Sequence, residues 1–354
     1  MDTPVLQSVV RTSVLWQGNK LLFFGGFDYH RHSSHPKVLS TFQQASKEFG
    51  INSGGSLWTT GTHPFHKKLE EEIGRFIGFD EVALFPSCFL ANQTLIHHFI
   101  KNKYNIFYPN HSHPSLKPFA SGKSYSYSDL DKLESSVEKT EKPLIIAESI
   151  INHGNKIAPI NEMMRRIPHA HFLIDDAHGI GVIGKKGRGV CENYDLNKTN
   201  LLITGSMSKG IGIFGGFIAG AEQIIQKLKN TSPIYQGSSA LPIPVCAGAI
   251  KSIQILKNEP EKISNLQRTA ISFKESLITN DLKIPLSKTP VSALNITDND
   301  LLKKLKENLL INGIFPSLIH YPGSPARGIF RFALSSVHSQ EEVDRLFSVL
   351  VSTL

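Results

Sequence analysis

The stretch Phe172-Leu173-Ile174-Asp175-Asp176-Ala177-His178-Gly179 decides the fold. Its first three residues form an apolar run that predicts a strand buried on both faces, and Asp175 and His178 then follow at the carboxyl end of that strand. A second apolar run, Leu201-Leu202-Ile203, leads to Lys209, which lies 34 residues after Asp175. That spacing is about the length of one strand–crossover–strand step in a parallel sheet. We therefore expect the aspartate and the lysine to face each other from neighbouring strands.

Apolar stretches on both sides of these two strands extend the same pattern from Val82 to about Gly220. Strand candidates alternate with helical stretches, which predicts an α/β fold with a mostly parallel central sheet flanked by helices. The strand candidates are Val82–Phe85, Ile106–Tyr108, Leu144–Ala147, His171–Ile174, Leu201–Thr204 and Gly216–Ala219. Beyond about residue 258 the pattern changes to helices with a few strands, which predicts a smaller α+β C-terminal domain. We expect three segments: 1–50, packing with the small domain; 51–245, the large domain; and 246–354, the small domain.

Composition limits the class of protein. The chain has 354 residues, of which 40% are hydrophobic and 19% charged, enough for a large core and a second domain. No apolar run of about 18 residues and no leader-like N-terminus is evident, so we expect a cytoplasmic protein with no membrane association. The three cysteines are widely spaced, and His30, His32 and His35 have no carboxylate or cysteine beside them. We therefore predict neither a disulfide framework nor a metal site.

The net charge of +8 invites comparison with nucleic-acid-binding proteins. The lysines, however, are spread along polar, helix-like stretches and do not form a basic stripe interleaved with aromatic residues. We predict no nucleic-acid partner. An anionic substrate such as a coenzyme A ester is compatible with the charge.

An amine and a carboxylate facing each other from neighbouring strands are the pair that pyridoxal 5′-phosphate requires. The lysine forms a Schiff base with the cofactor, and the carboxylate keeps its pyridine nitrogen protonated. Apolar and glycine-rich flanks indicate that Lys209 is carried into the interior, where desolvation lowers the pKa of its amine. The alternatives are a solvated loop lysine and, for Asp175, a helix cap or turn residue.

Three further positions suit the cofactor's phosphate. Ser87-Cys88-Phe89-Leu90-Ala91-Asn92 follows a predicted strand and opens a helix, whose first N–H groups can bind an anion. An ordinary N-cap at Ser87 is the alternative. Ser206, three residues before Lys209, and Ser239 could each add a hydroxyl to the same phosphate.

Two histidines and an arginine complete the candidate site. His113 follows a predicted strand and could stack on an aromatic cofactor or transfer protons, although it could also be a plain loop histidine. His178 can reach the phenolic oxygen of a pyridoxal ring, or it could be a turn residue. Arg331 lies inside the apolar run Ile329–Leu334 and should have a partner. A substrate carboxylate and an internal salt bridge are both open.

Together these residues resemble the α-oxoamine synthase family of fold-type-I pyridoxal phosphate enzymes, and most closely its 8-amino-7-oxononanoate synthase branch. The similarity runs over nearly the whole chain. The ordered pair Asp-x-Ala-His-Gly and Ser-x-x-Lys is its most specific part. The matching stretches are Phe24–Tyr29, Asn52–His66, Ser87–Asn92 and Ala333–His338.

The resemblance implies a role for each candidate residue. Lys209 would be the Schiff-base lysine and the base that removes the Cα proton, Asp175 would pair with the pyridine nitrogen, and His178 would bond to the ring oxygen. His113 would stack on the ring, and Arg331 would bind the amino acid carboxylate. The remaining cofactor contacts would be Cys88, Phe89, Ser206, Asn152 and, supplied by the neighbouring subunit of a homodimer, Ser239.

The reaction that the resemblance implies is the decarboxylative condensation of a small amino acid such as alanine with an acyl-coenzyme A thioester, as in biotin synthesis. Three positions depart from the family pattern: Phe27 replaces an asparagine, Leu57 an arginine and Asn152 a serine. These changes lie mostly on the substrate side. An aminotransferase, or a synthase using another amino acid or acyl carrier in secondary or signalling metabolism, therefore stays open, as does a non-catalytic homologue that binds cofactor or a partner protein.

Overall fold

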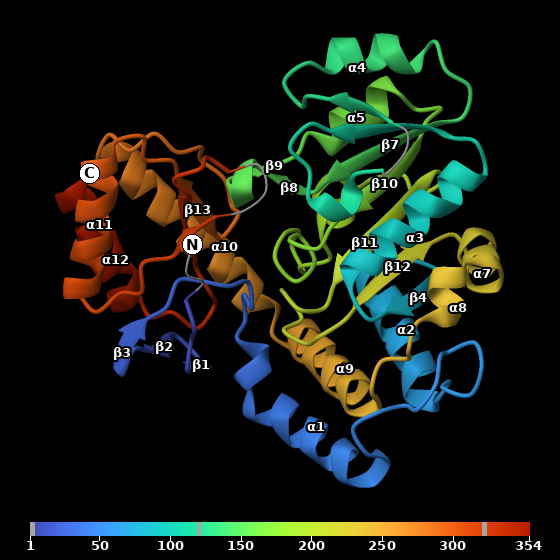
Figure 1. The fold of residues 1–354 in the computed structure, drawn as a ribbon, viewed down its shortest axis with the longest axis horizontal. Helices are drawn as coiled ribbons and strands as arrows, with labels where there is room; N and C mark the ends of the chain where they lie inside the picture. The colour runs from blue at the N-terminus through green and yellow to red at the C-terminus, as the bar shows by residue number, and fades with distance from the viewer. Residues whose placement is uncertain (1–3, 119–121, 321–323) are drawn as a thin grey trace.

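A seven-stranded sheet forms the centre of the larger part of the molecule (Figure 1). The computed structural model describes residues 4–118, 122–320 and 324–354. The strand order is β4-β12-β11-β10-β7-β5-β6, and β12 runs antiparallel to both of its neighbours while the other pairs are parallel. The predicted α/β fold with a mostly parallel sheet is thus confirmed. The strands are β4 (Glu81–Phe85), β5 (Asn105–Pro109), β6 (Lys123–Tyr125), β7 (Pro143–Glu148), β10 (His171–Asp175), β11 (Leu201–Ser206) and β12 (Gly216–Gly220).

The register of the sheet brings three strand ends together. Asp175 of β10 lies opposite Thr204 of β11 on one side and Glu148 of β7 on the other. The parallel step predicted between the strand of Asp175 and the strand that precedes Lys209 is present. Since ligands of open α/β sheets bind beyond the carboxyl ends of parallel strands, this edge is where a site should form.

The strands in the middle of the sheet are mostly apolar because helices cover both faces of the sheet. Phe172 and Ile174 of β10 point into one core, and Leu173 between them points into the other. The first core is shared with α2 (Pro64–Ile77), α4 (Leu130–Val137), α5 (Ile160–Arg166) and α6 (Val190–Tyr194). The second is shared with α3 (Cys88–Lys101), α7 (Glu222–Thr231) and α8 (Pro233–Gly237).

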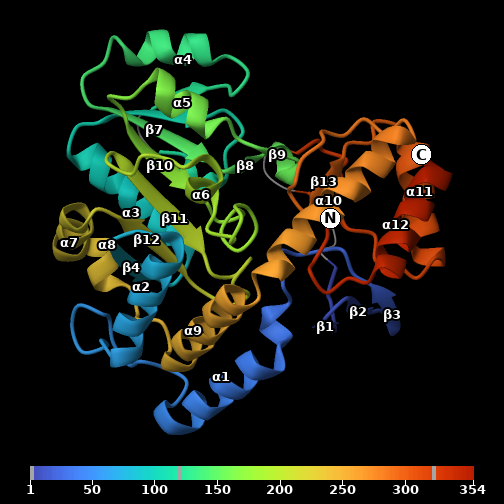
Figure 2. The same ribbon diagram turned by 180° about the vertical axis from the view of Figure 1, so that it is seen from behind.

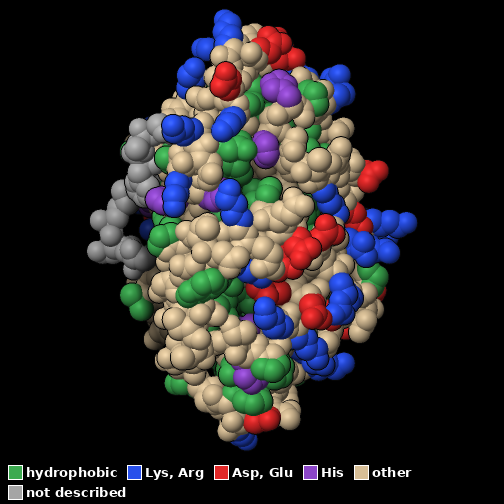
Figure 3. Space-filling model, turned by 90° about the vertical axis from the view of Figure 1, so that its right-hand side faces the viewer, with side chains coloured by type: hydrophobic (Ala, Val, Ile, Leu, Met, Phe, Trp, Pro, Cys, Tyr) green, Lys and Arg blue, Asp and Glu red, His purple; other side chains and the backbone are tan. Residues whose placement is uncertain are grey.

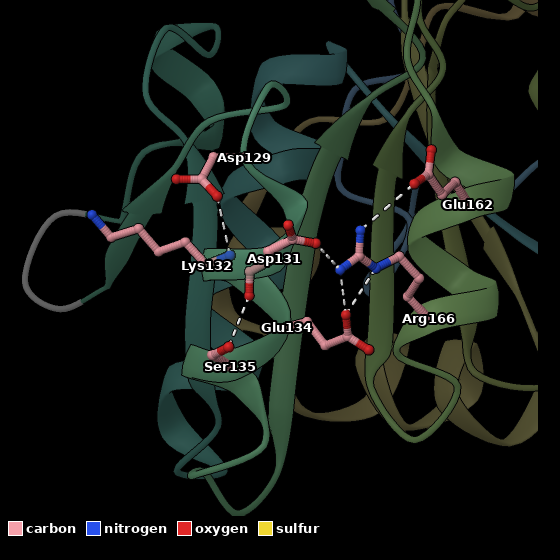
Figure 4. Close-up of polar contacts among 7 residues, drawn as sticks. All are labelled: Asp129, Asp131, Lys132, Glu134, Ser135, Glu162 and Arg166. Carbon is pink, nitrogen blue, oxygen red and sulfur yellow. Dashed lines mark hydrogen bonds and ion pairs between the residues drawn. The ribbon is translucent and has the colours of Figure 1, made fainter.

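An ion cluster on the surface joins α4 to α5 (Figure 4). Arg166 at the end of α5 pairs with Asp131 and Glu134 of α4, and with Glu162 one turn earlier on its own helix. Since the carboxylates are partly or largely exposed, the cluster orients the two helices more than it stabilises the protein.

The smaller part of the molecule surrounds a second antiparallel sheet. Its order is β13-β15-β14, with β13 (Val291–Leu294), β14 (Leu318–Ile319) and β15 (Ile329–Ala333). It packs with α10 (Pro260–Thr279), α11 (Asn299–Ile311) and α12 (Gln340–Thr353). An N-terminal sheet of β1 (Ser8–Val10), β2 (Ser13–Trp16) and β3 (Asn19–Leu22) lies beside it, with Leu22 bonded through its backbone to Gly313 and Phe315. The proposed division into three segments stays a prediction.

Two long helices connect the parts. Helix α1 (Pro36–Phe49) lies along α9 (Ile243–Asn258), where Gly248 allows Val38 and Phe42 to approach closely (Figures 1 and 2). After α9 the chain passes through Glu259, whose backbone is not helical, and continues directly into α10 of the smaller part. A short hairpin of β8 (Ile150–Ile151) and β9 (Lys156–Ile157), with η3 (Asn152–Gly154) at its turn, lies between the two sheets. The remaining short helices are η1 (His32–Ser34) and η2 (Pro114–Leu116).

On the face of the molecule seen in Figure 3, lysine and arginine side chains are interspersed with acidic ones. Within the described ranges, no helix combines the length and the apolar character that crossing a lipid bilayer requires.

Candidate active site

A cavity of about 580 Å³ lies between the carboxyl ends of the parallel strands and the smaller sheet. Four of the predicted site residues line it: His113, His178, Lys209 and Arg331. They come from four separate segments, namely the loop after β5, the turn after β10, the loop after β11 and strand β15. These four residues therefore line one cavity, as a shared site requires. Their individual roles stay predictions.

Asp175 is held at the base of the site by hydrogen bonds that suit an ionised carboxylate. Asn92 Nδ2 donates to its Oδ2 at 2.7 Å, and the backbone N–H of Ala177 donates to its Oδ1 at 2.9 Å. Thr204 Oγ1 in turn donates to Asn92 Oδ1 at 2.6 Å, which fixes the amide orientation. Donors on both oxygens stabilise the charged form of a carboxylate. The site thus places a fixed negative charge at the end of β10.

The same amide connects Asp175 to His113. Asn92 Nδ2 also donates to Ser115 Oγ at 2.9 Å, and that hydroxyl lies 2.6 Å from His113 Nδ1. The backbone N–H of Ser115 also donates to Nδ1, at 3.1 Å. Because Nδ1 accepts these bonds, a neutral His113 carries its proton on Nε2. The sequence analysis placed Asn92 in the helix-opening stretch but missed this role, since nothing local indicates its partners.

Lys209 follows β11 and lies in an environment that favours its neutral amine. Burial lowers its pKa, and the negative charge of Asp175 offsets that effect in part. A lysine with a lowered pKa supplies an unprotonated amine that can act as a nucleophile or a base. The expectation of a buried lysine, as against a solvated loop lysine, agrees with this geometry.

His178 lies beside aromatic rings at the cavity wall. Its Nδ1 is 2.9 Å from the Tyr29 hydroxyl, and its ring meets that of Phe27 edge to face with centroids 4.6 Å apart. Burial holds the pKa of His178 well below its usual value, and the cations Lys209 and Arg331 lower it further. The imidazole is therefore neutral at physiological pH.

The N-terminus of α3 approaches β12 closely. A Cβ atom at Gly216 would lie 2.2 Å from the backbone nitrogen of Cys88, so only glycine fits there. Gly216 pairs across the sheet with the buried Ser206, which brings that serine next to the helix terminus. Ser87 caps the helix by accepting from Leu90 N–H, as the alternative interpretation expected. The other N–H groups of a helix's first turn have no partner within the helix and can bind an anion.

Arg331 lies over the ring of Phe27. The guanidinium carbon lies 4.1 Å from the ring centroid, and Lys209 Nζ lies 5.7 Å from the same centroid. Phe27 thus lies close to both cations and stabilises the arginine through a cation–π interaction. This aromatic residue replaces the asparagine that the family resemblance led us to expect.

Other predicted residues lie elsewhere. Ser239 is exposed and pairs with Ser56 outside the cavity lining, while Leu57 is half-buried in a loop. Phe89 is 43% exposed and meets the His113 ring edge to face at 6.2 Å. The side chain of Asn152 lies outside the described part of the chain.

Glu148 is a site residue that the sequence analysis did not identify. It ends β7, lines the cavity beside Asp175, and has an Oε1 atom 3.4 Å from the His113 backbone nitrogen. Burial, followed by the charge of Asp175, raises its pKa to about 8. At neutral pH it is mostly protonated. Its position at the end of a predicted strand was the available signal.

The arrangement fits pyridoxal phosphate on structural grounds. Lys209, whose pKa burial lowers, and two neutral histidines line one cavity; the carboxylate of Asp175 is held at the adjoining end of β10, and the close approach at Gly216 leaves a helix N-terminus facing the adjoining strand end. These are the donor types that the aldehyde, pyridine nitrogen, ring oxygen and phosphate of this cofactor require.

Comparison with known proteins identifies the family. The model of the family described as aminotransferase class I and II matches residues 24–350. The chain is 28% identical to 8-amino-7-oxononanoate synthase of Nitrosococcus oceani, covering 99% of this chain and 96% of that one. It is also 28% identical to serine palmitoyltransferase of Bacteroides thetaiotaomicron, covering 96% and 89%.

Solved structures agree. Serine palmitoyltransferase of Sphingomonas wittichii superimposes with a TM-score of 0.90 at 26% identity, covering 99% of this chain and 91% of that one. For 8-amino-7-oxononanoate synthase of Francisella tularensis the TM-score is 0.82 at 22% identity, with coverage of 94% and 97%. The second match bears on the fold alone.

The chain belongs to the aminotransferase class I and II family. Within that family it is an α-oxoamine synthase, as its sequence resemblance predicted. The predicted enzyme class, a pyridoxal-phosphate-dependent acyltransferase, is confirmed with it.

Proposed function

We propose that this enzyme condenses a small amino acid such as alanine with an acyl-coenzyme A thioester, releasing carbon dioxide and coenzyme A. The observation that carries the proposal is that Lys209 and Arg331 line one cavity, with Lys209 Nζ 5.7 Å and the Arg331 guanidinium carbon 4.1 Å from the centroid of the Phe27 ring. A lysine base and a carboxylate-binding arginine are what an amino acid substrate needs. Several relatives bear the name 8-amino-7-oxononanoate synthase, which supports a small amino acid as the acceptor of the acyl group.

Bound pyridoxal phosphate supplies an electron sink for the negative charge that develops at Cα. The chain's own residues do the rest. The neutral amine of Lys209 takes the Cα proton, and Arg331 holds the substrate carboxylate. Asp175 stabilises a protonated pyridine nitrogen, the first turn of α3 and Ser206 hold the phosphate, and His113 and His178 contact the ring.

The walls of the cavity suit a thioester. Its hairpin side is apolar, formed by Ile150, Ile151, Ile157 and Pro159, which favours an acyl chain. The exposed Lys156 lies on the same hairpin and is available to an anionic carrier such as coenzyme A. Phe27 fills space between Lys209 and Arg331, which favours an amino acid with a small side chain.

A homodimer in the cytoplasm is part of the same proposal. Ser239 is exposed and lies outside the cavity of its own chain, which is compatible with a phosphate contact supplied to the neighbouring subunit.

A second candidate is condensation of serine with a long-chain thioester. The 0.90 TM-score and 26% identity to a serine palmitoyltransferase favour keeping it. The two candidates share all cofactor contacts and differ only in the substrates used.

The experiment is a titration of the purified holoenzyme with a panel of amino acids and acyl-coenzyme A esters. We expect release of coenzyme A and carbon dioxide with one small amino acid, and no release from Lys209→Ala, which should also lose the visible absorption band of the lysine-bound cofactor. Lys185→Ala, at an exposed position outside the cavity, is the control and should retain both. Conversion of the cofactor to its amine form with no coenzyme A release from any ester would instead establish an aminotransferase.

A further inference from the structure

Tyr29 forms a buried contact with His178 that the proposed reaction does not use. Its side chain is 1% exposed, and its hydroxyl lies 2.9 Å from His178 Nδ1. The backbone carbonyl of Tyr29 accepts from Ser336 N–H at 2.8 Å, which fixes the residue to the smaller part of the molecule. The phenol therefore has a defined position relative to the imidazole.

Both groups are neutral at physiological pH. Burial raises the pKa of Tyr29 above its usual value, so the phenol keeps its proton. Burial and the nearby cations Lys209 and Arg331 keep the pKa of His178 low, so the imidazole has one N–H and one lone pair. Two arrangements remain: either the phenol donates to Nδ1, or Nδ1–H donates to the phenol oxygen.

The burial of the hydroxyl decides between them. Among the described residues, His178 is the one hydrogen-bond partner of the Tyr29 hydroxyl. If Nδ1 carried the proton, the phenol's own hydrogen would have no acceptor within the described protein, and an unpaired buried donor costs about 1–3 kcal/mol. When the phenol donates to Nδ1, both groups are satisfied. The histidine proton then lies on Nε2.

We propose that Tyr29 is a positioning residue that fixes the Nε2–H tautomer of His178, so that the imidazole presents a hydrogen-bond donor to the cavity. This inference rests on the proposed cofactor site. A donor there suits the phenolic oxygen of pyridoxal, the acceptor that the resemblance assigns to His178. Phe27, edge to face with the imidazole, limits rotation of the ring and keeps the donor's direction fixed.

The first test measures the tautomer directly in cofactor-free wild-type protein labelled with ¹⁵N-histidine. Long-range ¹H–¹⁵N spectra distinguish the two tautomers, and a His178→Asn variant identifies the resonance. A protonated Nε2 and an unprotonated Nδ1 are expected for His178. A protonated Nδ1 would overturn the proposal.

The second test measures the affinity of cofactor-free protein for pyridoxal phosphate and for its analogue lacking the ring hydroxyl. Tyr29→Phe should weaken binding of pyridoxal phosphate about three- to tenfold, the range expected for one net hydrogen bond, and leave binding of the analogue unchanged. Tyr194→Phe is the matched control, because its hydroxyl donates to Ala158 O outside the cavity lining. It should change neither affinity.

The outcomes are separable. Equal weakening of binding for both compounds would mean that Tyr29 acts through packing alone. No weakening for either compound would mean that Tyr29 does not determine which nitrogen of His178 carries the proton. Either result overturns the inference. If wild-type protein bound neither compound, the proposed function would fail, while the tautomer measurement would still decide the role of Tyr29.

Discussion

One amide side chain determines the geometry at the base of the site. Asn92 is fully buried, donates to Asp175 and Ser115, and accepts from Thr204. It therefore joins the strand ends of β10 and β11 to the loop that carries His113. Without it Thr204 Oγ1 would lose its acceptor, and Asp175 and Ser115 would each lose one hydrogen bond, and lost bonds at buried polar groups are costly.

We predict that Asn92→Ala lowers the free energy of unfolding by about 2–4 kcal/mol and weakens cofactor binding at the same time, because hydrogen bonds to charged groups are worth more than neutral ones. Denaturant unfolding and cofactor titration measure the two effects. Asn102→Ala, at the other end of α3, is the control. Its amide donates to the carbonyl of His98 in a less buried place, so a loss below about 1 kcal/mol is expected. An equal loss in the two variants would contradict the role given to Asn92.

At the level of elements, six strands of the large sheet could be predicted because each contains a buried apolar run, whereas the edge strand β6 was missed because Lys123 and Ser124 are polar and exposed. Predicted Leu144–Ala147 and Leu201–Thr204 differ from β7 and β11 by one or two residues at their ends. The reversed direction of β12 could not be predicted, since a central strand has the same apolar pattern in either direction. The contacts of Asn92 and Tyr29 could not be predicted either, because their partners are 83 and 149 residues away.

Helix α10 contains a buried lysine whose side chain has no acidic partner within the described part of the chain. Lys274 is 1% exposed, and its Nζ donates to Ser287 Oγ, Thr289 Oγ1 and Thr289 O at 2.7–2.8 Å. Burial lowers its pKa to about 7. Ser287 in turn donates to the backbone carbonyl of Asn155, which follows the cavity residues His153 and Gly154. The lysine thus attaches α10 to the hairpin beside the cavity.

The pKa of Lys274 predicts a pH dependence of stability. Above about pH 7 the folded protein has released this proton, whereas the unfolded chain keeps it up to about pH 10. The unfolded state then binds more protons, so the free energy of unfolding should rise with pH in this window. We expect wild type to gain about 2 kcal/mol relative to Lys274→Met between about pH 7 and pH 9. Urea unfolding at the two pH values measures this difference. Lys283→Met, at an exposed position, should show no such change.

At the scale of the whole molecule, three aromatic side chains are exposed in the described residues of the larger part. Trp58 is 51% exposed, Phe89 43% and Phe214 60%. They lie in the loop before α2, the first turn of α3 and the loop after Lys209. Burial of such groups between two copies is a physical reason to expect the proposed homodimer.

We predict that Phe214→Glu converts the protein from a dimer to a monomer, because it would place a charge in the apolar contact. Sedimentation velocity measures the mass. Ile278→Glu, on α10 of the smaller part and 40% exposed, is the control and should remain dimeric. Dimers of undiminished stability for Phe214→Glu would place the contact elsewhere.

The connection between α9 and α10 joins the part of the molecule that carries Lys209 to the part that carries Arg331. Ser252 of α9 donates to the carbonyl of Ile211, in the loop that carries Lys209, while Phe273 of α10 belongs to the same core as Phe330 and Phe332, the neighbours of Arg331 in β15. One non-helical residue, Glu259, separates the two helices. Glu259 is therefore the residue at which the helical path between the two parts is interrupted. Rotation about its backbone bonds would change the distance between the lysine amine and the guanidinium, and so how closely the Cα atom and the carboxylate of a bound amino acid can be held to both groups at once.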